Sequence, residues 1–271
     1  MTDNQKFIKY LAIGLAIFLI ILIVVGVIGA FTTLGVLFGG VKNEPQKNGD
    51  MYVYSDFQNT VNLDADIGVS YFKIDTGDKL SVETNSDKIK VYQKGNTLVI
   101  EETSKWNLIS KDKFEITLFV PADFSFSDVE ISTGAGKFDA ARLSAQEIDL
   151  ELGAGDVEIG TLEALRDIDI SGGAGRIRIN DGSLYNLDLE MGVGKLEITS
   201  TMLGENKIEC GIGDADINLT DTLSAYRISV DKGIGNAKLN GNTVADGTNY
   251  GEGTNRIKID CGIGDLNITT K

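Results

Sequence analysis

Three kinds of residue in this sequence could do chemistry: cysteines, carboxylates and glycine-rich loops. The chain has 2 Cys and 40 Asp and Glu residues, and a Gly-x-Gly motif recurs along its C-terminal half. Histidine is absent, which excludes histidine-based triads and histidine metal sites. Two cysteines are too few for a closed cysteine zinc site. The candidate chemistry is therefore limited to thiols, carboxylates and glycine loops.

The glycine motifs do not match known ligand-binding loops. Gly192-Val-Gly-Lys195 is followed by Leu196 and lacks the frame of a phosphate-binding loop. A dinucleotide fingerprint opens a helix, whereas every motif here leads into an alternating, strand-like segment. The start of the calcium-binding nonapeptide occurs at Gly172-Gly-Ala-Gly175, but apolar residues stand where its ligand aspartate belongs. We therefore expect no cofactor and no metal at these motifs.

The motif instead marks a structural repeat. Its glycines are Gly134, Gly136, Gly153, Gly155, Gly173, Gly175, Gly192, Gly194, Gly211, Gly213, Gly233, Gly235, Gly262 and Gly264. Apolar and polar residues alternate on both sides, which indicates half-buried strands. The phase of the alternation slips by one residue at each motif, so the chain must bend there. Glycine suits such a bend because it allows positive φ and close backbone approach.

A repeat of about 19 residues with two strands and one corner predicts an all-β, single-stranded β-solenoid. The alternative is an antiparallel meander closing into a barrel, but a barrel has no reason to repeat the same corner at every second strand. Residues 79–83, 88–92, 97–102 and 114–120 also read as strands without the motif. We interpret them as atypical coils that cap the solenoid at its N-terminal end.

The two cysteines occupy equivalent places, just before Gly-Ile-Gly in the fifth and seventh motifs. If motifs stack in chain order, Cys210 and Cys261 lie two coils apart, with Lys232 between them. That separation is about 9–10 Å, beyond the reach of a disulfide. We therefore expect free, buried thiols that pack as small apolar groups.

The outward positions before the corner form an acidic column. A possible binding face for divalent cations or a basic partner is predicted at Glu130, Asp149, Glu151, Asp169, Asp188, Glu190 and Glu209. The alternative is a merely solvated face that prevents sideways aggregation. Positions after the corner mix both signs, so stacked neighbours there can pair. No carboxylate pair is specific enough to assign a catalytic residue; an envelope carbohydrate hydrolase using carboxylates on the side of the solenoid is the third candidate function.

The N-terminus predicts a membrane anchor. Residues 10–41 carry no charge, and residues 11–28 are the densest apolar part, long enough to span a bilayer. Lys6 and Lys9 balance Lys42 and Lys47, so the positive-inside rule does not set the orientation. We expect a cytoplasmic N-terminus and an extracytoplasmic body at the cell membrane. The net charge of −15 argues against nucleic acid as a partner.

The predicted organisation has four parts: a tail with a transmembrane helix (1–41), a polar linker (42–50), N-terminal capping coils (51–127) and the Gly-x-Gly solenoid (128–271). Residues 240–255 are rich in Gly, Asn and Thr and are expected to form a surface loop. The chain ends at Lys271, soon after the last repeat. A final coil without a cap could stack end to end on another copy.

The sequence resembles a bacterial family of β-strand-repeat domains of unknown function, labelled putative adhesins, with relatives in cell-envelope stress-response proteins. The resemblance lies in Leu98–Glu101, Ile116–Pro121, Val129–Gly136 and the following Gly-x-Gly strands, and covers residues 60–271. It implies a β-solenoid in a membrane-linked setting and carries over no catalytic residue. We expect a non-enzymatic, adhesin-like protein that meets a protein or envelope polymer. A stress-sensing or scaffold role is the alternative.

Overall fold

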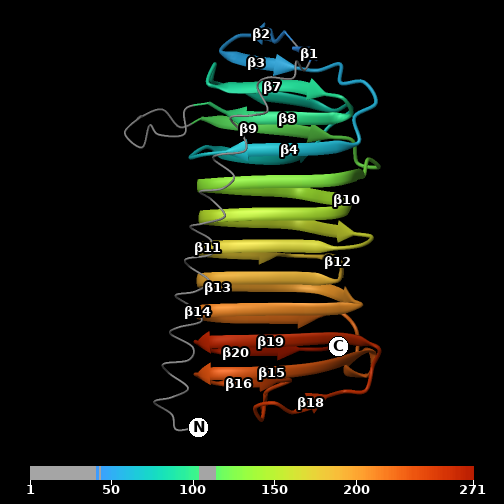
Figure 1. Ribbon diagram of the computed structural model, residues 1–271, viewed down its shortest axis with the longest axis vertical. Helices are drawn as coiled ribbons and strands as arrows, with labels where there is room; N and C mark the ends of the chain where they lie inside the picture. The colour runs from blue at the N-terminus through green and yellow to red at the C-terminus, as the bar shows by residue number, and fades with distance from the viewer. Residues whose placement is uncertain (1–40, 43, 104–113) are drawn as a thin grey trace.

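The computed structural model describes residues 41–42, 44–103 and 114–271, which form an elongated all-β rod (Figure 1). The strands are β1 Val41–Lys42, β2 Gln46–Asn48, β3 Met51–Tyr54, β4 Asn62–Ile67, β5 Tyr71–Thr76, β6 Ser81–Thr84, β7 Ile89–Lys94, β8 Thr97–Glu102, β9 Glu115–Val120, β10 Phe126–Ala164, β11 Ile168–Ile179, β12 Gly182–Tyr185, β13 Leu187–Leu203, β14 Glu205–Leu219, β15 Tyr226–Ile234, β16 Ala237–Leu239, β17 Asn242–Thr243, β18 Asn249–Tyr250, β19 Asn255–Ile263 and β20 Leu266–Thr269, with a 3₁₀ turn at Leu223–Ala225.

The predicted membrane span, residues 11–28, lies outside the described residues. None of the helices within them has the length and apolar character needed to cross a membrane. Part of the expected linker, Gln46–Asn48, is strand β2 and pairs with β3.

The central strands stack in parallel and in register. Between β11 and β13, Ile168 pairs with Leu187 and Ile179 with Ile198, 19 residues further along the chain in both cases. The same spacing relates β13 to β14. Parallel pairing of successive repeats is the ladder of a solenoid, and it excludes the antiparallel meander.

Each coil has three sides, one more than the sequence predicted. In the coil of residues 148–164, buried side chains come from Ile148 to Leu152, from Val157 and Ile159, and from Leu162 and Ala164. The third side is short. In the next coil it is strand β12, which pairs with β10 on one side and β13 on the other. The chain needs this side to return to the start of the next coil. The inward residues of all coils stack into one apolar core.

Glycine is required at the corner because stacked backbones nearly touch. A Cβ on Gly153 would collide with the carbonyl oxygen of Gly134 in the preceding coil. Gly213 has φ of +137° as well, and its Cβ would collide with the carbonyl oxygen of Gly194. Both physical reasons expected for the motif are therefore present: close approach at every coil and a left-handed backbone at several of the second glycines.

The coils do not stack in chain order at either end of the rod. Strand β4 comes before β8 in the sequence, yet it lies between β8 and β10 and pairs in parallel with both. At the other end β19 pairs with β14 on one side and with β15 on the other. The last coil is therefore inserted beside the fifth motif, and the sixth motif is displaced to the end of the rod (Figure 1).

Antiparallel strands close both ends. At the N-terminal end β6 pairs with β9 and β7 with β8, and β3 and β1 pair onto these. At the C-terminal end β17 pairs with β16 and β18 with β15. Both of these strands lie in residues 240–255, so the expected surface loop is the cap. The expectation of an uncapped last coil is wrong, because that coil is internal.

The inversion also corrects the cysteine geometry. Cys210 pairs directly with Cys261 on the adjacent strand, and Lys232 follows on the far side of Cys261. The predicted two-coil separation is wrong because it assumed that motifs stack in chain order. Both thiols are free in the structure, Cys261 buried and Cys210 half-buried.

Candidate functional site: the acidic face

The first side of the coils presents two outward columns of mainly acidic residues. They stand on β4, β8, β10, β11, β13 and β14, because alternate residues of a strand point away from the core. We call this surface the acidic face, which comprises Asp64, Asp66, Glu101, Glu130, Asp149, Glu151, Asp169, Asp188, Glu190 and Glu209. All seven acids predicted from the sequence lie on it.

Three further acids were missed in the sequence. Asp64 and Asp66 pair with Glu130 and Ser132 in the next coil, and Glu101 pairs with Asp66. The signal was present: Leu63-Asp-Ala-Asp-Ile67 alternates, and Gly68-Val-Ser70 stands where later coils have Gly-x-Gly. Because Ser70 replaces the second glycine, this coil lacks the Gly-x-Gly motif that marks the others.

Five carboxylates on this face resist ionisation: Asp64, Asp149, Glu151, Asp169 and Glu190. The pKa of Asp64 is raised to about 6, first by partial burial and then by the negative charges of Glu130, Asp66 and Glu101. The pKa of Asp149 is raised to about 6 in the same way, first by partial burial and then by the negative charges of Glu151, Asp169 and Glu130. The pKa values of Asp169 and Glu190 are raised as well, with burial the larger cause and a neighbouring acid the next. Like charges on adjacent strands cost free energy at neutral pH.

The face has two electrostatically different parts. Near the C-terminal end, the ammonium group of Lys207 lies 3.2 Å from Glu209, 3.7 Å from Asp188 and 3.8 Å from Glu190. In the N-terminal part, no Lys or Arg nitrogen of the described residues lies within 4 Å of the carboxylates of Glu130, Asp149 or Asp169. The uncompensated negative charge is therefore concentrated towards the N-terminal half of the rod.

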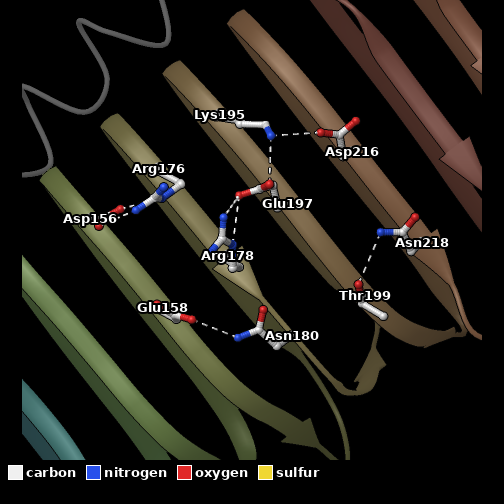
Figure 2. A network of polar contacts seen from close by, with 10 residues as sticks. All are labelled: Asp156, Glu158, Arg176, Arg178, Asn180, Lys195, Glu197, Thr199, Asp216 and Asn218. Carbon is white, nitrogen blue, oxygen red and sulfur yellow. Dashed lines mark hydrogen bonds and ion pairs between the residues drawn. The ribbon is translucent and has the colours of Figure 1, made fainter.

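The second side of the coils neutralises itself. Arg176 donates two hydrogen bonds to Asp156 in the preceding coil, at 2.8 and 2.6 Å. Figure 2 shows the neighbouring network, in which Arg178 and Lys195 both bind Glu197 and Lys195 also reaches Asp216. We call this surface the paired face: Asp156, Glu158, Arg176, Arg178, Asn180, Lys195, Glu197, Thr199, Asp216 and Asn218. The predicted pairing of mixed signs is confirmed.

The pKa directions agree with this difference. The Arg176 guanidinium lowers the pKa of Asp156, and Lys195 and Arg178 lower the pKa of Glu197. On the paired face ionisation is favoured by a neighbour of opposite sign. On the acidic face it is opposed by burial and by neighbours of the same sign.

The middle residue of the first six Gly-x-Gly motifs lies at the exposed apex of the corner, whereas Ile263 in the seventh is half-buried. Ala135 and Ala154 continue the apolar alternation of the strands that precede them in the sequence, but both are exposed. Towards the C-terminal end the residue is larger: Val193, Ile212 and Ile234 are 50%, 46% and 50% exposed. The sequence signal for this apolar ridge is the change from Ala to Val and Ile along the motifs.

The acidic residues of this face are spread along the rod rather than gathered at one point. In the part of the chain that the structure describes, no three acidic or cysteine side chains are grouped so as to hold one metal ion. Carboxylates spread along columns, one per coil, suit an extended cationic partner better than a single ion, because each coil offers the same charge again about 4.8 Å further on.

The fold and the face define a capped β-solenoid with one acidic side. A family model described as Toastrack DUF4097 matches residues 61–269, and the chain belongs to this family. The comparison with curated proteins found no match.

Several solved structures are similar to the chain. A "putative adhesin" from Bacteroides fragilis is 16% identical, covers 84% of this chain and 99% of its own, and has a TM-score of 0.45. A "putative cell adhesion protein" from Clostridium sporogenes is 17% identical, with coverage of 84% and 100% and a TM-score of 0.38. A "putative lipid binding protein" from Parabacteroides distasonis is 16% identical, with coverage of 83% and 98% and a TM-score of 0.36. At these TM-scores the likeness carries no argument about function.

Proposed function

We propose that the protein is a membrane-anchored, non-enzymatic surface protein whose solenoid is extracytoplasmic and binds an extended cationic partner in the cell envelope through its acidic face. Such a partner is a basic protein segment or an amine-bearing polymer. An adhesin-like role is the form of this activity that the family label suggests.

One observation carries the proposal: Glu130, Asp149 and Asp169 stand in successive coils without a basic neighbour within 4 Å in the described structure. The paired face of the same coils shows that this fold readily accommodates compensating arginines and lysines. A row of unpaired carboxylates at strand spacing opposes stacking. A cationic partner would remove that cost on binding.

Binding to a defined polycation tests the proposal. The full chain in detergent micelles is titrated with poly-L-lysine, and the variant Asp149→Asn/Asp169→Asn is compared with Asp156→Asn/Glu158→Gln. Each variant loses two carboxylates, so the net charge is matched. We expect the acidic-face variant to bind about tenfold more weakly and the paired-face variant to bind nearly as wild type, with both affinities falling as salt rises. Equal loss in both variants would show that only net charge matters, contrary to the proposal.

Topology is tested separately. Protease applied to intact cells is expected to remove the solenoid while leaving the N-terminal segment. A protected solenoid would place the body in the cytoplasm and contradict the proposed display. The end-to-end scaffold alternative started from an uncapped last coil; in the structure that coil is internal, and the short strands β17 and β18 pair onto β16 and β15 at this end of the rod.

A further inference from the structure

The two cysteines lie side by side where the last coil enters the rod. Cys210 on β14 and Cys261 on β19 are partners in a parallel, in-register pair, with Glu209–Asp260 before them and Ile212–Ile263 after them. Adjacent parallel strands are about 4.8 Å apart, within the Cα separation that a disulfide spans. The neighbouring Cys210 thiol, together with burial, raises the pKa of Cys261.

We propose that Cys210 and Cys261 form a reversible disulfide that fastens the inserted last coil to the body of the solenoid. The bond would close a loop running from Cys210 to Cys261. This loop contains β15, β16 and both strands of the C-terminal cap. A covalent link here holds the only strand, among those described, that separates β14 from β15.

The position explains why a link is useful at this point. The inserted coil is reached through the long connection of residues 240–254, and its strands pair with neighbours from two different coils. If the inserted coil left its place, the hydrogen-bonded pairing of β19 with β14 and with β15 would be lost, and the terminal coil would separate from the body of the solenoid. A cross-link to β14 keeps the coil in place while its other side stays paired with β15. Closing a loop of this length removes disordered conformations that the reduced chain can reach.

The chemistry is thiol–disulfide exchange with a disulfide oxidant such as oxidised glutathione. Cys210 is the more accessible thiol and attacks first as its thiolate, forming a mixed disulfide and releasing one oxidant thiolate. The Cys261 thiolate then attacks the Cys210 sulfur, forming the Sγ–Sγ bond and releasing the second thiolate. Two protein protons are lost, and the electron pair reduces the oxidant to two thiols. Because the pKa of Cys261 is raised, the second step is expected to be faster at alkaline pH.

The experiment uses the purified full chain in detergent, fully reduced and then exposed to oxidised glutathione. We expect both free thiols to be lost, an intact mass lower by two hydrogens, and a peptide that joins the segments around Cys210 and Cys261. The oxidised form should melt about 5 °C or more above the reduced form, and a reductant should reverse the shift. Persistent free thiols, or a stable glutathione adduct at Cys210, would overturn the proposal.

Matched variants make the test specific to the register. Met191 pairs with Cys210 on the other side, so it is one coil from Cys210 and two coils from Cys261. The variant Met191→Cys/Cys261→Ser should therefore cross-link under the same conditions, and Met191→Cys/Cys210→Ser should not. Equal cross-linking in both would mean that the coil is mobile and that neighbouring register does not direct the bond. These experiments do not depend on where the protein resides, so their failure is distinguishable from failure of the proposed surface role.

Discussion

Each end of the rod contains a coil that is inserted out of chain order, but different groups contact the corner of that coil at the two ends. At the N-terminal end, the coil of β4 and β5 lies between the coil of β8 and β9 and strand β10. At the C-terminal end, the coil of β19 and β20 lies between β14 and the coil of β15 and β16. At the N-terminal end the corner of the inserted coil rests on a side chain, the buried carboxylate of Glu102. At the C-terminal end it is stacked between backbones. An inserted coil leaves a different coil to be capped, which is β8–β9 at the N-terminal end and β15–β16 at the C-terminal end.

The carboxylate of Glu102 replaces a missing corner. It accepts hydrogen bonds from the backbone N–H groups of Gly68 and Val69, at 2.8 and 3.2 Å, and from the Ser70 hydroxyl at 2.8 Å. Its side chain is fully buried. In the interior of the rod, carbonyl groups of the neighbouring coil accept such N–H groups, as Gly68 does for Ala135 at 2.7 Å. One glutamate thus completes the corner ladder where no further Gly-x-Gly coil follows.

Cross-linking across each inserted coil tests most directly whether both ends depart from chain order. At the C-terminal end, Lys232→Cys/Cys210→Ser should form a disulfide with Cys261, whereas Lys232→Cys/Cys261→Ser should not, because β19 lies between β14 and β15. Stacking in chain order predicts the opposite for the second variant. Mass spectrometry after treatment with oxidised glutathione reads both outcomes.

The N-terminal end has an equivalent pair of variants, made in a Cys210→Ser/Cys261→Ser background. Asp66 is the direct neighbour of Ser132, and Glu101 lies one strand further away. Asp66→Cys/Ser132→Cys should cross-link, and Glu101→Cys/Ser132→Cys should not. Cross-linking only in the second variant would restore chain order at this end and remove the likeness between the ends.

The corner glycines should respond differently to a methyl group. Gly264 has φ of +144°, and its Cβ would collide with the carbonyl oxygen of Gly213. We expect Gly264→Ala to reduce the free energy of unfolding by about 3–4 kcal/mol. At Gly68 the added atom would meet only the Glu102 side chain, at 3.3 Å, so Gly68→Ala should cost about 1 kcal/mol. Urea unfolding measures both, and similar losses would contradict the backbone contact at the C-terminal corner.

Removing the carboxylate tests whether one side chain completes the N-terminal corner. Glu102→Ala leaves the N–H groups of Gly68 and Val69 without their acceptor, and we expect a loss of about 2–3 kcal/mol in the free energy of unfolding. Glu102→Gln, which keeps one acceptor oxygen, should lose less. The adjacent, outward Glu101→Gln is the control and should change the value by less than about 0.5 kcal/mol. A harmless Glu102→Ala would mean that the corner needs no acceptor.

The smallest expected effect concerns charge on the two parts of the acidic face. Burial and the surrounding acids raise the pKa of Asp149 from 3.8 to about 6, so the folded state holds this proton more tightly than the unfolded state. Its contribution to the free energy of unfolding therefore falls as the pH rises from about 4 to about 6. Because the side chain faces solvent, the effect is screened: Asp149→Asn should stabilise the protein at pH 7.5 by about 0.5–1 kcal/mol and have no effect near pH 4.

The control for this prediction lies on the same face. Asp188 is 3.7 Å from the Lys207 ammonium group, so Asp188→Asn should be neutral or slightly destabilising at pH 7.5. Thermal melts across the pH range compare the two variants. Equal stabilisation by both would show that Lys207 does not divide the face into two parts.

Much of the solenoid could be predicted because its signals are local. Alternation in Ile148–Leu152, the one-residue slip at Gly153-Ala-Gly155 and the acids at Asp149 and Glu151 all lie within a few residues of one another. The third side was missed because it contributes only one or two buried residues, such as Leu162 and Ala164. The coil of Asp64 was missed because its corner lacks the second glycine.

The sequence alone therefore determined the coil: which residues face the core, where the chain turns and which columns carry charge. Only the tertiary structure decided which coils are neighbours at the ends. Every coil presents nearly the same alternating edge, so the pairing of Cys210 with Cys261 or with Lys232 satisfies the local pattern equally well. The arrangement is defined by the pairing of β19 with β14 and β15 and of the cap strands with β15 and β16. Those are non-local contacts, which no window of the sequence contains.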